Sequence, residues 1–99
     1  MIRLLIADDE RLEREALVEM VSRRFEHEVV LETAENGRKA ADTAILWGAD
    51  LILMDILMPE LGGVEASREI RSISSAPILF LTAKSQERDM LQAYQSGGD

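Results

Sequence analysis

Short apolar runs alternate with longer segments of mixed polarity along most of this sequence. The runs are rich in Ile, Val and Leu, contain few polar residues and cover positions 2–7, 29–33, 51–54 and 78–81. Runs of this length and composition are typical of β-strands whose two faces are both buried in a sheet. We therefore predict four buried strands.

The segments between these runs show the period of an α-helix. In the first segment, apolar residues recur at a spacing that we interpret as one helix face: Leu12, Ala16, Leu17, Met20 and Val21. A second helix is predicted from Asn36-Gly37 to near Gly48, a third over residues 64–73 and a fourth over residues 86–94. Strands that alternate with helices in this way indicate right-handed βαβ units and a parallel sheet with helices on both faces.

Length and charge narrow the class of protein. With 99 residues the chain forms one domain at most, and its 46% of hydrophobic residues is enough for a folded core. No apolar run reaches the length of a signal peptide or a transmembrane helix, so we expect a cytoplasmic location without membrane contact. The net charge of −8 argues against direct nucleic-acid binding by this segment, and the absence of cysteine excludes thiol catalysis.

Acidic residues gather where the predicted strands end. Asp8, Asp9 and Glu10 follow the first strand, Asp55 follows the third, and Thr82 follows the fourth. Ligands of open parallel sheets bind at the carboxyl ends of the strands, so we expect these side chains to meet at one edge. Clustered carboxylates repel one another, which predicts either raised pKa values or a bound cation. Mg²⁺ suits such oxygen ligands best.

Each of these residues also fits a simpler interpretation. Asp8 or Asp9 could cap the first helix, since Asp is frequent at that position. Asp55 could be a solvated residue at a strand end, and Thr82 could be an ordinary β-branched strand residue. Their conjunction at the ends of three strands favours a functional site.

Three motifs of the sequence resemble the receiver domain of two-component response regulators: LLIADDE, LILMDILMP and PILFLTAK. They keep the family's order and spacing and cover essentially the whole chain. The resemblance implies a flavodoxin-like, doubly wound parallel α/β sheet with strand order 2-1-3-4. It also implies that residues 1–99 are a receiver domain that is incomplete at its C-terminal end, without the family's fifth strand, lysine and fifth helix.

By the same resemblance, Asp55 is the residue that accepts a phosphoryl group from a sensor histidine kinase. Asp9 and Asp55 would bind Mg²⁺, Asp8 would assist through water, and the backbone carbonyl of Leu57 would add a further metal contact. Thr82 would turn its hydroxyl toward the phosphoryl group. Ala83 would stay small to leave room for it.

The resemblance also implies what surrounds the phosphoacceptor. We expect a signalling domain rather than an enzyme, one that catalyses only its own phosphoryl transfer and dephosphorylation and switches a transcriptional output. The segment IADDERLEREAL is suggestive of receivers joined to AraC-type DNA-binding domains, and no such output domain lies in this chain. An uncovered edge strand and sheet face would favour self-association or a homodimer.

Two alternatives remain open at this point. A non-phosphorylated interaction module would fit the absence of the family lysine. A phosphatase of the haloacid dehalogenase type also uses an aspartate after an apolar strand, but it needs a second acid two residues later, where this chain has Leu57.

The sequence departs from the receiver family at Gly62, where receiver domains often have an acidic residue. We interpret this as a tolerable change in a loop.

Overall fold

The computed structural model describes residues 1–81 of the chain. Within these residues, four parallel strands form one sheet in the order β2-β1-β3-β4, which confirms the predicted fold class and strand order. The elements follow one another as β1 (Ile2–Ala7), α1 (Arg11–Phe25), β2 (Val29–Ala34), α2 (Gly37–Thr43), η1 (Ala44–Gly48), β3 (Leu51–Asp55), α3 (Gly63–Arg71) and β4 (Ile78–Leu81).

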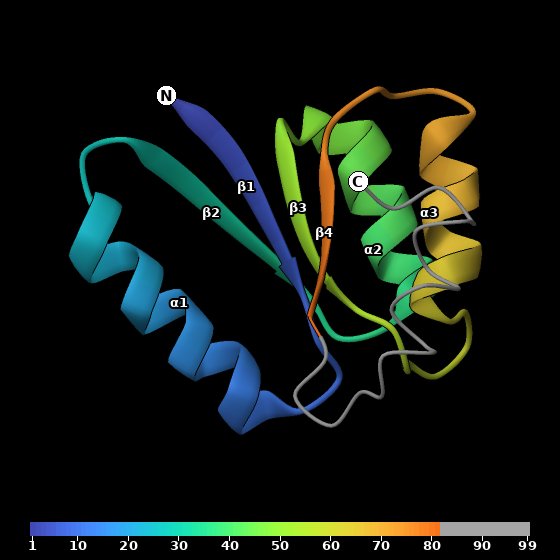
Figure 1. Ribbon diagram of the computed structural model, residues 1–99, viewed down its shortest axis with the longest axis horizontal. Coiled ribbons are helices and arrows are strands. Elements are labelled where there is room, and N and C mark those ends of the chain that lie inside the picture. The colour runs from blue at the N-terminus through green and yellow to red at the C-terminus, as the bar shows by residue number, and fades with distance from the viewer. Residues whose placement is uncertain (82–99) are drawn as a thin grey trace.

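Helices cover both faces of the sheet. Figure 1 shows α1 on one side, whereas α2 and α3 lie together on the other. The main hydrophobic core lies between the sheet and the α2–α3 pair, and it includes Leu5, Ala7, Ile52, Met54 and Ile78 from the strands and Ala40, Ala41, Ala44, Ala66 and Ile70 from the helical side. Burying one large aliphatic side chain contributes roughly 1.5–3 kcal/mol, so this layer fixes the sheet to α2 and α3.

The prediction of strands buried on both faces holds for the centre of the sheet and is wrong at its edge. In β1, the four residues from Leu4 to Ala7 are all buried. In β2, residues alternate between half-buried and exposed, and Val30 keeps 42% of its surface accessible. The residues of β2 are more exposed because β2 is the outermost strand of the sheet, next to β1, and one of its faces is only partly covered.

The single apolar face predicted for α1 is wrong for three of its five members. Leu17 and Val21 are half-buried, whereas Ala16 is exposed and Leu12 and Met20 have 74% and 56% of their surface accessible. Successive residues of an α-helix are turned by about 100°, which puts Leu12 and Val21 on opposite sides of the helix. The apolar residues of α1 are therefore spread over half of its surface, and only part of that half contacts the sheet.

The second helix begins where the sequence predicts. Asn36 is the N-cap of α2, and its side-chain oxygen accepts a hydrogen bond from the Lys39 backbone N–H at 2.7 Å. The helix continues as a π-helical segment over Ala44–Gly48. Gly48 has a φ of 79°, a left-handed conformation that glycine adopts without steric cost and that ends the segment.

Several predictions lie outside the described residues. They are the fourth helix over residues 86–94 and the two proposed switch positions, Thr82 and Ala83. The proposed end of the domain before a fifth strand also stays a prediction. Within residues 1–81, no helix is long and apolar enough to cross a membrane.

Candidate functional site

The carboxyl ends of β1 and β3 bring three carboxylates together. The two strands pair with Ala7 opposite Met54, so Asp8 and Asp55 follow at the same end of the sheet. Asp8, Asp9 and Asp55 each offer one oxygen atom, and these oxygens all lie within 4.8 Å of one another. The meeting of carboxylates predicted from the strand ends is therefore present in the structure.

Asp8 is fixed by the backbone around it. Its side chain is almost fully buried, at 2% exposure, and one carboxylate oxygen accepts a hydrogen bond from the Glu10 N–H at 2.9 Å. Its backbone N–H continues the β1–β2 ladder to the Ala34 carbonyl at 3.0 Å. The N-cap of α1 is Glu10, which makes no side-chain capping bond, so neither Asp8 nor Asp9 is the helix cap that the simpler interpretation proposed.

Asp55 is half-buried, and its pKa is shifted by its surroundings in the cluster. Burial and the negative charge of Asp8 raise its pKa to about 6, with a smaller contribution from Asp9. Hydrogen bonds from the backbone N–H groups of Leu57 and Ile56 act in the opposite direction. The raised pKa that clustered carboxylates predict is thus found at Asp55, and a bound cation would remove the repulsion that contributes to it.

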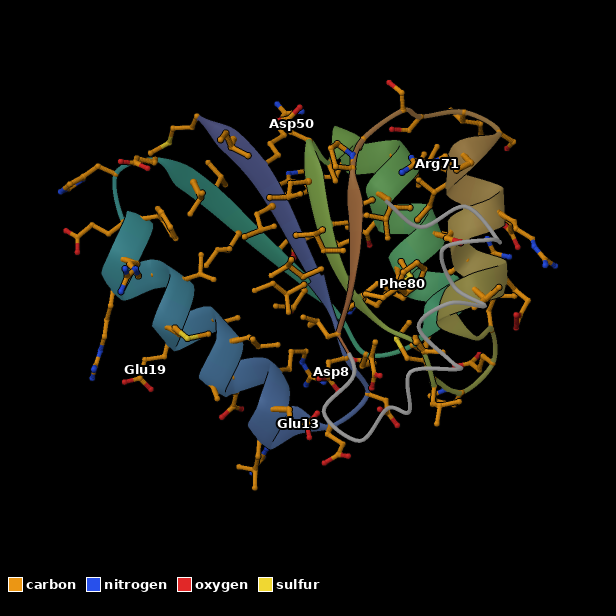
Figure 2. The ribbon with its side chains drawn as sticks, in the orientation of Figure 1. Asp8, Glu13, Glu19, Asp50, Arg71 and Phe80 are labelled. Atoms are coloured by element: carbon orange, nitrogen blue, oxygen red, sulfur yellow. The ribbon has the colours of Figure 1, made fainter. Side chains whose placement is uncertain are left out.

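Glu13 is a fourth acidic residue at this site, and the sequence patterns did not single it out. It lies in the first turn of α1, and a hydrogen bond with the Asp8 side chain raises its pKa. Figure 2 shows Glu13 and Asp8 at the same end of the sheet. Its partner Asp8 is five positions earlier and outside the helix, so no helical spacing in the sequence signals this contact.

The loop of residues 56–62 joins β3 to α3 and forms one rim of the site. Its second residue, Leu57, has a side chain that is 78% exposed. An open groove of about 640 Å³ lies between this loop, Asp9 and the residues of α3 up to Arg68. Asp9 of the acidic cluster is therefore accessible to a partner molecule from the side of the loop.

Two glycines lie so close to backbone atoms at this loop that they fix its position. Gly63 donates its N–H to the Ile56 carbonyl at 2.7 Å, and a Cβ atom at Gly63 would overlap the carbonyl oxygen of Asp55. A Cβ atom at Gly37 would likewise overlap the carbonyl oxygen of Leu61. The backbone of the loop thus packs against the start of α2 at Gly37, and the start of α3 packs against the end of β3 at Gly63, with no room for a side chain at either glycine.

These features are those of a receiver domain, and sequence comparison agrees. The sequence model described as "Response regulator receiver domain" matches residues 4–99, so the chain belongs to that family. The transcriptional regulatory protein PdtaR of Mycobacterium tuberculosis is 44% identical over 96 residues, which are 97% of this chain and 45% of PdtaR. The chain spans less than half the length of the curated relatives it matches first.

Solved structures of the same fold include two that bear on the site. The receiver domain of the sensor histidine kinase PA1611 from Pseudomonas aeruginosa, which has a magnesium ion coordinated in its active-site cleft, is 28% identical with a TM-score of 0.82 and covers 99% of this chain and 80% of that one. The receiver domain of yeast Ssk1, solved with the histidine phosphotransfer protein Ypd1, is also 28% identical with a TM-score of 0.82, and the match covers 99% of this chain and 74% of that one.

Proposed function

We propose that Asp55 accepts a phosphoryl group from a phosphohistidine of a sensor histidine kinase or phosphotransfer protein, with Mg²⁺ as cofactor. The observation that carries this proposal is the meeting of the Asp8, Asp9 and Asp55 oxygens within 4.8 Å at the ends of two adjacent strands. The complex of Ssk1 with a histidine phosphotransfer protein supports the class of partner. The PA1611 receiver supports the class of metal.

The residues present fit Mg²⁺. The donors are carboxylate oxygens, which this hard cation prefers, and they are few enough to leave positions for water and for a phosphoryl group. Asp9 and Asp55 would hold the ion, with Asp8 acting through water and the Leu57 carbonyl as a further ligand. When bound, the cation would neutralise charge on the oxygens of the transferring group.

The chain itself supplies the nucleophile. An oxygen of the Asp55 carboxylate attacks phosphorus in line with the bond to the donor histidine. A P–O bond forms as the P–N bond breaks, and the electron pair stays on the imidazole nitrogen, which then takes up a proton. Asp55 must be ionised to attack, and a pKa of about 6 leaves it ionised at neutral pH.

We further propose a transcriptional output, supported by relatives that are named as transcriptional regulatory proteins. DNA contact would belong to an output domain, AraC-type on the suggestion of the sequence, rather than to this acidic segment. The chain would act in the cytoplasm as a switch that catalyses only its own phosphorylation and dephosphorylation. Thr82 and Ala83 keep their proposed roles beside the phosphoryl group.

Replacing Asp9 with asparagine is expected to weaken Mg²⁺ binding by about tenfold or more, because one charged ligand becomes neutral. Amide chemical shifts of Asp8, Asp9 and Asp55 during Mg²⁺ titration measure the change. Trp47 fluorescence is a poor reporter, since Trp47 lies beside Arg3 at the opposite end of β1. An equal loss in a control Asp42→Asn variant, which alters an exposed pair on α2, would contradict the assignment.

The affinity for Mg²⁺ is expected to fall steeply below about pH 6. The pKa of Asp55 is raised to about 6, and a proton on this carboxylate competes with the cation. Affinity should change little above that pH and drop by up to about tenfold per pH unit well below it. Calorimetric titrations between about pH 5 and about pH 7.5 measure the profile. A flat profile would show that Asp55 does not bind the ion.

A further inference from the structure

The tip of the loop between β3 and α3 is tied to the start of α2. Figure 1 shows the start of α2 beside this loop. Asn36 donates a hydrogen bond from its side-chain amide nitrogen to a carboxylate oxygen of Glu60 at 2.9 Å, across 24 positions of sequence. The amide oxygen of Asn36 simultaneously accepts from the Lys39 N–H at 2.7 Å. The α2 cap therefore orients the amide that reaches the loop.

Glu60 has a conformation that glutamate rarely adopts. Its φ is 68°, and among the described residues it is the non-glycine residue with positive φ. This region is unfavourable for residues with a Cβ atom and persists where surrounding contacts hold it. The hydrogen bond from Asn36 is such a contact, because it needs a side chain at position 60 that glycine would not provide.

The held tip lies on the same short loop that serves Asp55. Leu61, next to Glu60, has its carbonyl against Gly37, and Gly63 bonds back to Ile56 at 2.7 Å. The N–H groups of Ile56 and Leu57 in turn bond to the Asp55 carboxylate. The loop is thus held at its tip and at its base, with the backbone that contacts the phosphoacceptor between these points.

We propose that Asn36 and Glu60 are positioning residues, which hold the loop so that the backbone of Ile56 and Leu57 stays in place for Asp55 and its cation. This inference rests on the proposed function for the effect on Mg²⁺. It also gives an expectation for the metal-free chain, because the hydrogen bonds from Ile56 and Leu57 to Asp55 join groups of the protein itself.

The test exchanges the donor and the acceptor of the hydrogen bond between positions 36 and 60. Asn36→Asp keeps an oxygen that can cap α2, but it removes the donor to Glu60 and sets two carboxylates against each other. Glu60→Gln alone keeps an acceptor for Asn36. In the double variant, the glutamine amide introduced at position 60 donates to the aspartate carboxylate introduced at position 36, so the connection returns with its polarity reversed.

Asn36→Asp is expected to weaken Mg²⁺ binding about three- to tenfold, in the range of losing one ordinary hydrogen bond, because the bond between Asn36 and Glu60 is exposed to solvent. Glu60→Gln and the double variant should stay within about twofold of the unmodified chain. In the metal-free chain, Asn36→Asp should also shift the amide resonances of Ile56 and Leu57, and the double variant should return them. A residue that only stabilises the fold would not show this pattern of loss and rescue.

A matched control uses the other side-chain link of the same helix. Arg38 pairs with Glu69 at 2.6 Å and joins α2 to α3 without touching the loop. Glu69→Gln weakens this pair and is expected to leave Mg²⁺ affinity and the Ile56 and Leu57 resonances unchanged. Urea unfolding of every variant separates a loss of stability from a loss of positioning.

Two results would overturn the inference: unchanged loop resonances in Asn36→Asp, or no recovery of these resonances in the double variant. An equal effect of Glu69→Gln would also overturn it, since any link of α2 would then suffice. If the unmodified chain binds no Mg²⁺, the proposed function fails. The resonances of Ile56 and Leu57 in the metal-free variants still decide whether Asn36 and Glu60 position the loop.

Discussion

The Asp55→Asn chain is expected to show no phosphorylation after exposure to acetyl phosphate and Mg²⁺. The chain without substitutions should acquire an alkali-labile phosphoryl group. An asparagine amide cannot form the acyl phosphate, because it is neutral and a poor nucleophile. Asp8 is no substitute, since its carboxylate is buried and bonded to the Glu10 N–H. Intact-mass spectrometry, followed by mapping of the modified residue, measures the result.

A matched control for this experiment is Asp50→Asn. Asp50 lies at the opposite end of the sheet from Asp8, as Figure 2 shows, and it accepts a hydrogen bond from the Arg3 N–H at 2.9 Å. This variant should be phosphorylated as fully as the chain without substitutions. Modification that persists in Asp55→Asn, or that maps to Asp8 or Asp9, would contradict the assignment. An unmodified chain that binds Mg²⁺ but is never phosphorylated would favour the interaction module instead.

The alternation of strands and helices and the acidic cluster could be predicted because both follow from where apolar runs end, whereas the strand order came from the resemblance to receiver domains. The runs before Asp8 and Asp55 are β1 and β3, and parallel pairing of these strands brings their carboxyl ends together. No detail of side-chain packing was needed for that step. The face of α1 was a different problem, because its apolar residues spread over half of the helix. Only contact with the sheet selects Leu17 and Val21 over Leu12 and Met20.

The parts of the site that the sequence did not reveal depend on loop geometry. Asn36 and Glu60 are 24 positions apart, and Glu60 lies in the loop with a positive φ. Glu13 reaches Asp8 because α1 starts immediately after the strand-end acids. Neither contact leaves a periodic pattern in the sequence, so a method that reads periods and strand ends cannot find them. The same holds for Gly63, whose importance comes from the backbone that lies against it.

The adjacent glycines Gly62 and Gly63 are expected to respond to alanine in opposite ways. A Cβ atom at Gly63 would overlap the Asp55 carbonyl oxygen and lie 2.9 Å from the Cα atom of Ile56, so backbone atoms would have to move. A Cβ atom at Gly62 would meet only the end of the Glu65 side chain closely, at 2.7 Å, and that flexible, exposed side chain can turn away. Gly62 also has an ordinary φ of −67°.

We therefore expect Gly63→Ala to lower the free energy of unfolding by about 2–4 kcal/mol, and Gly62→Ala to change it by less than about 1 kcal/mol. In a domain of this size, each kcal/mol corresponds to roughly 4–8 °C in melting temperature. Urea unfolding followed by circular dichroism measures both values. Because the displaced atoms belong to Asp55 and Ile56, Gly63→Ala should also weaken Mg²⁺ binding, whereas Gly62→Ala should preserve it. Equal stability of the two variants would mean that α3 does not begin against the end of β3 in solution, and that the loop at the phosphoacceptor is held in some other way.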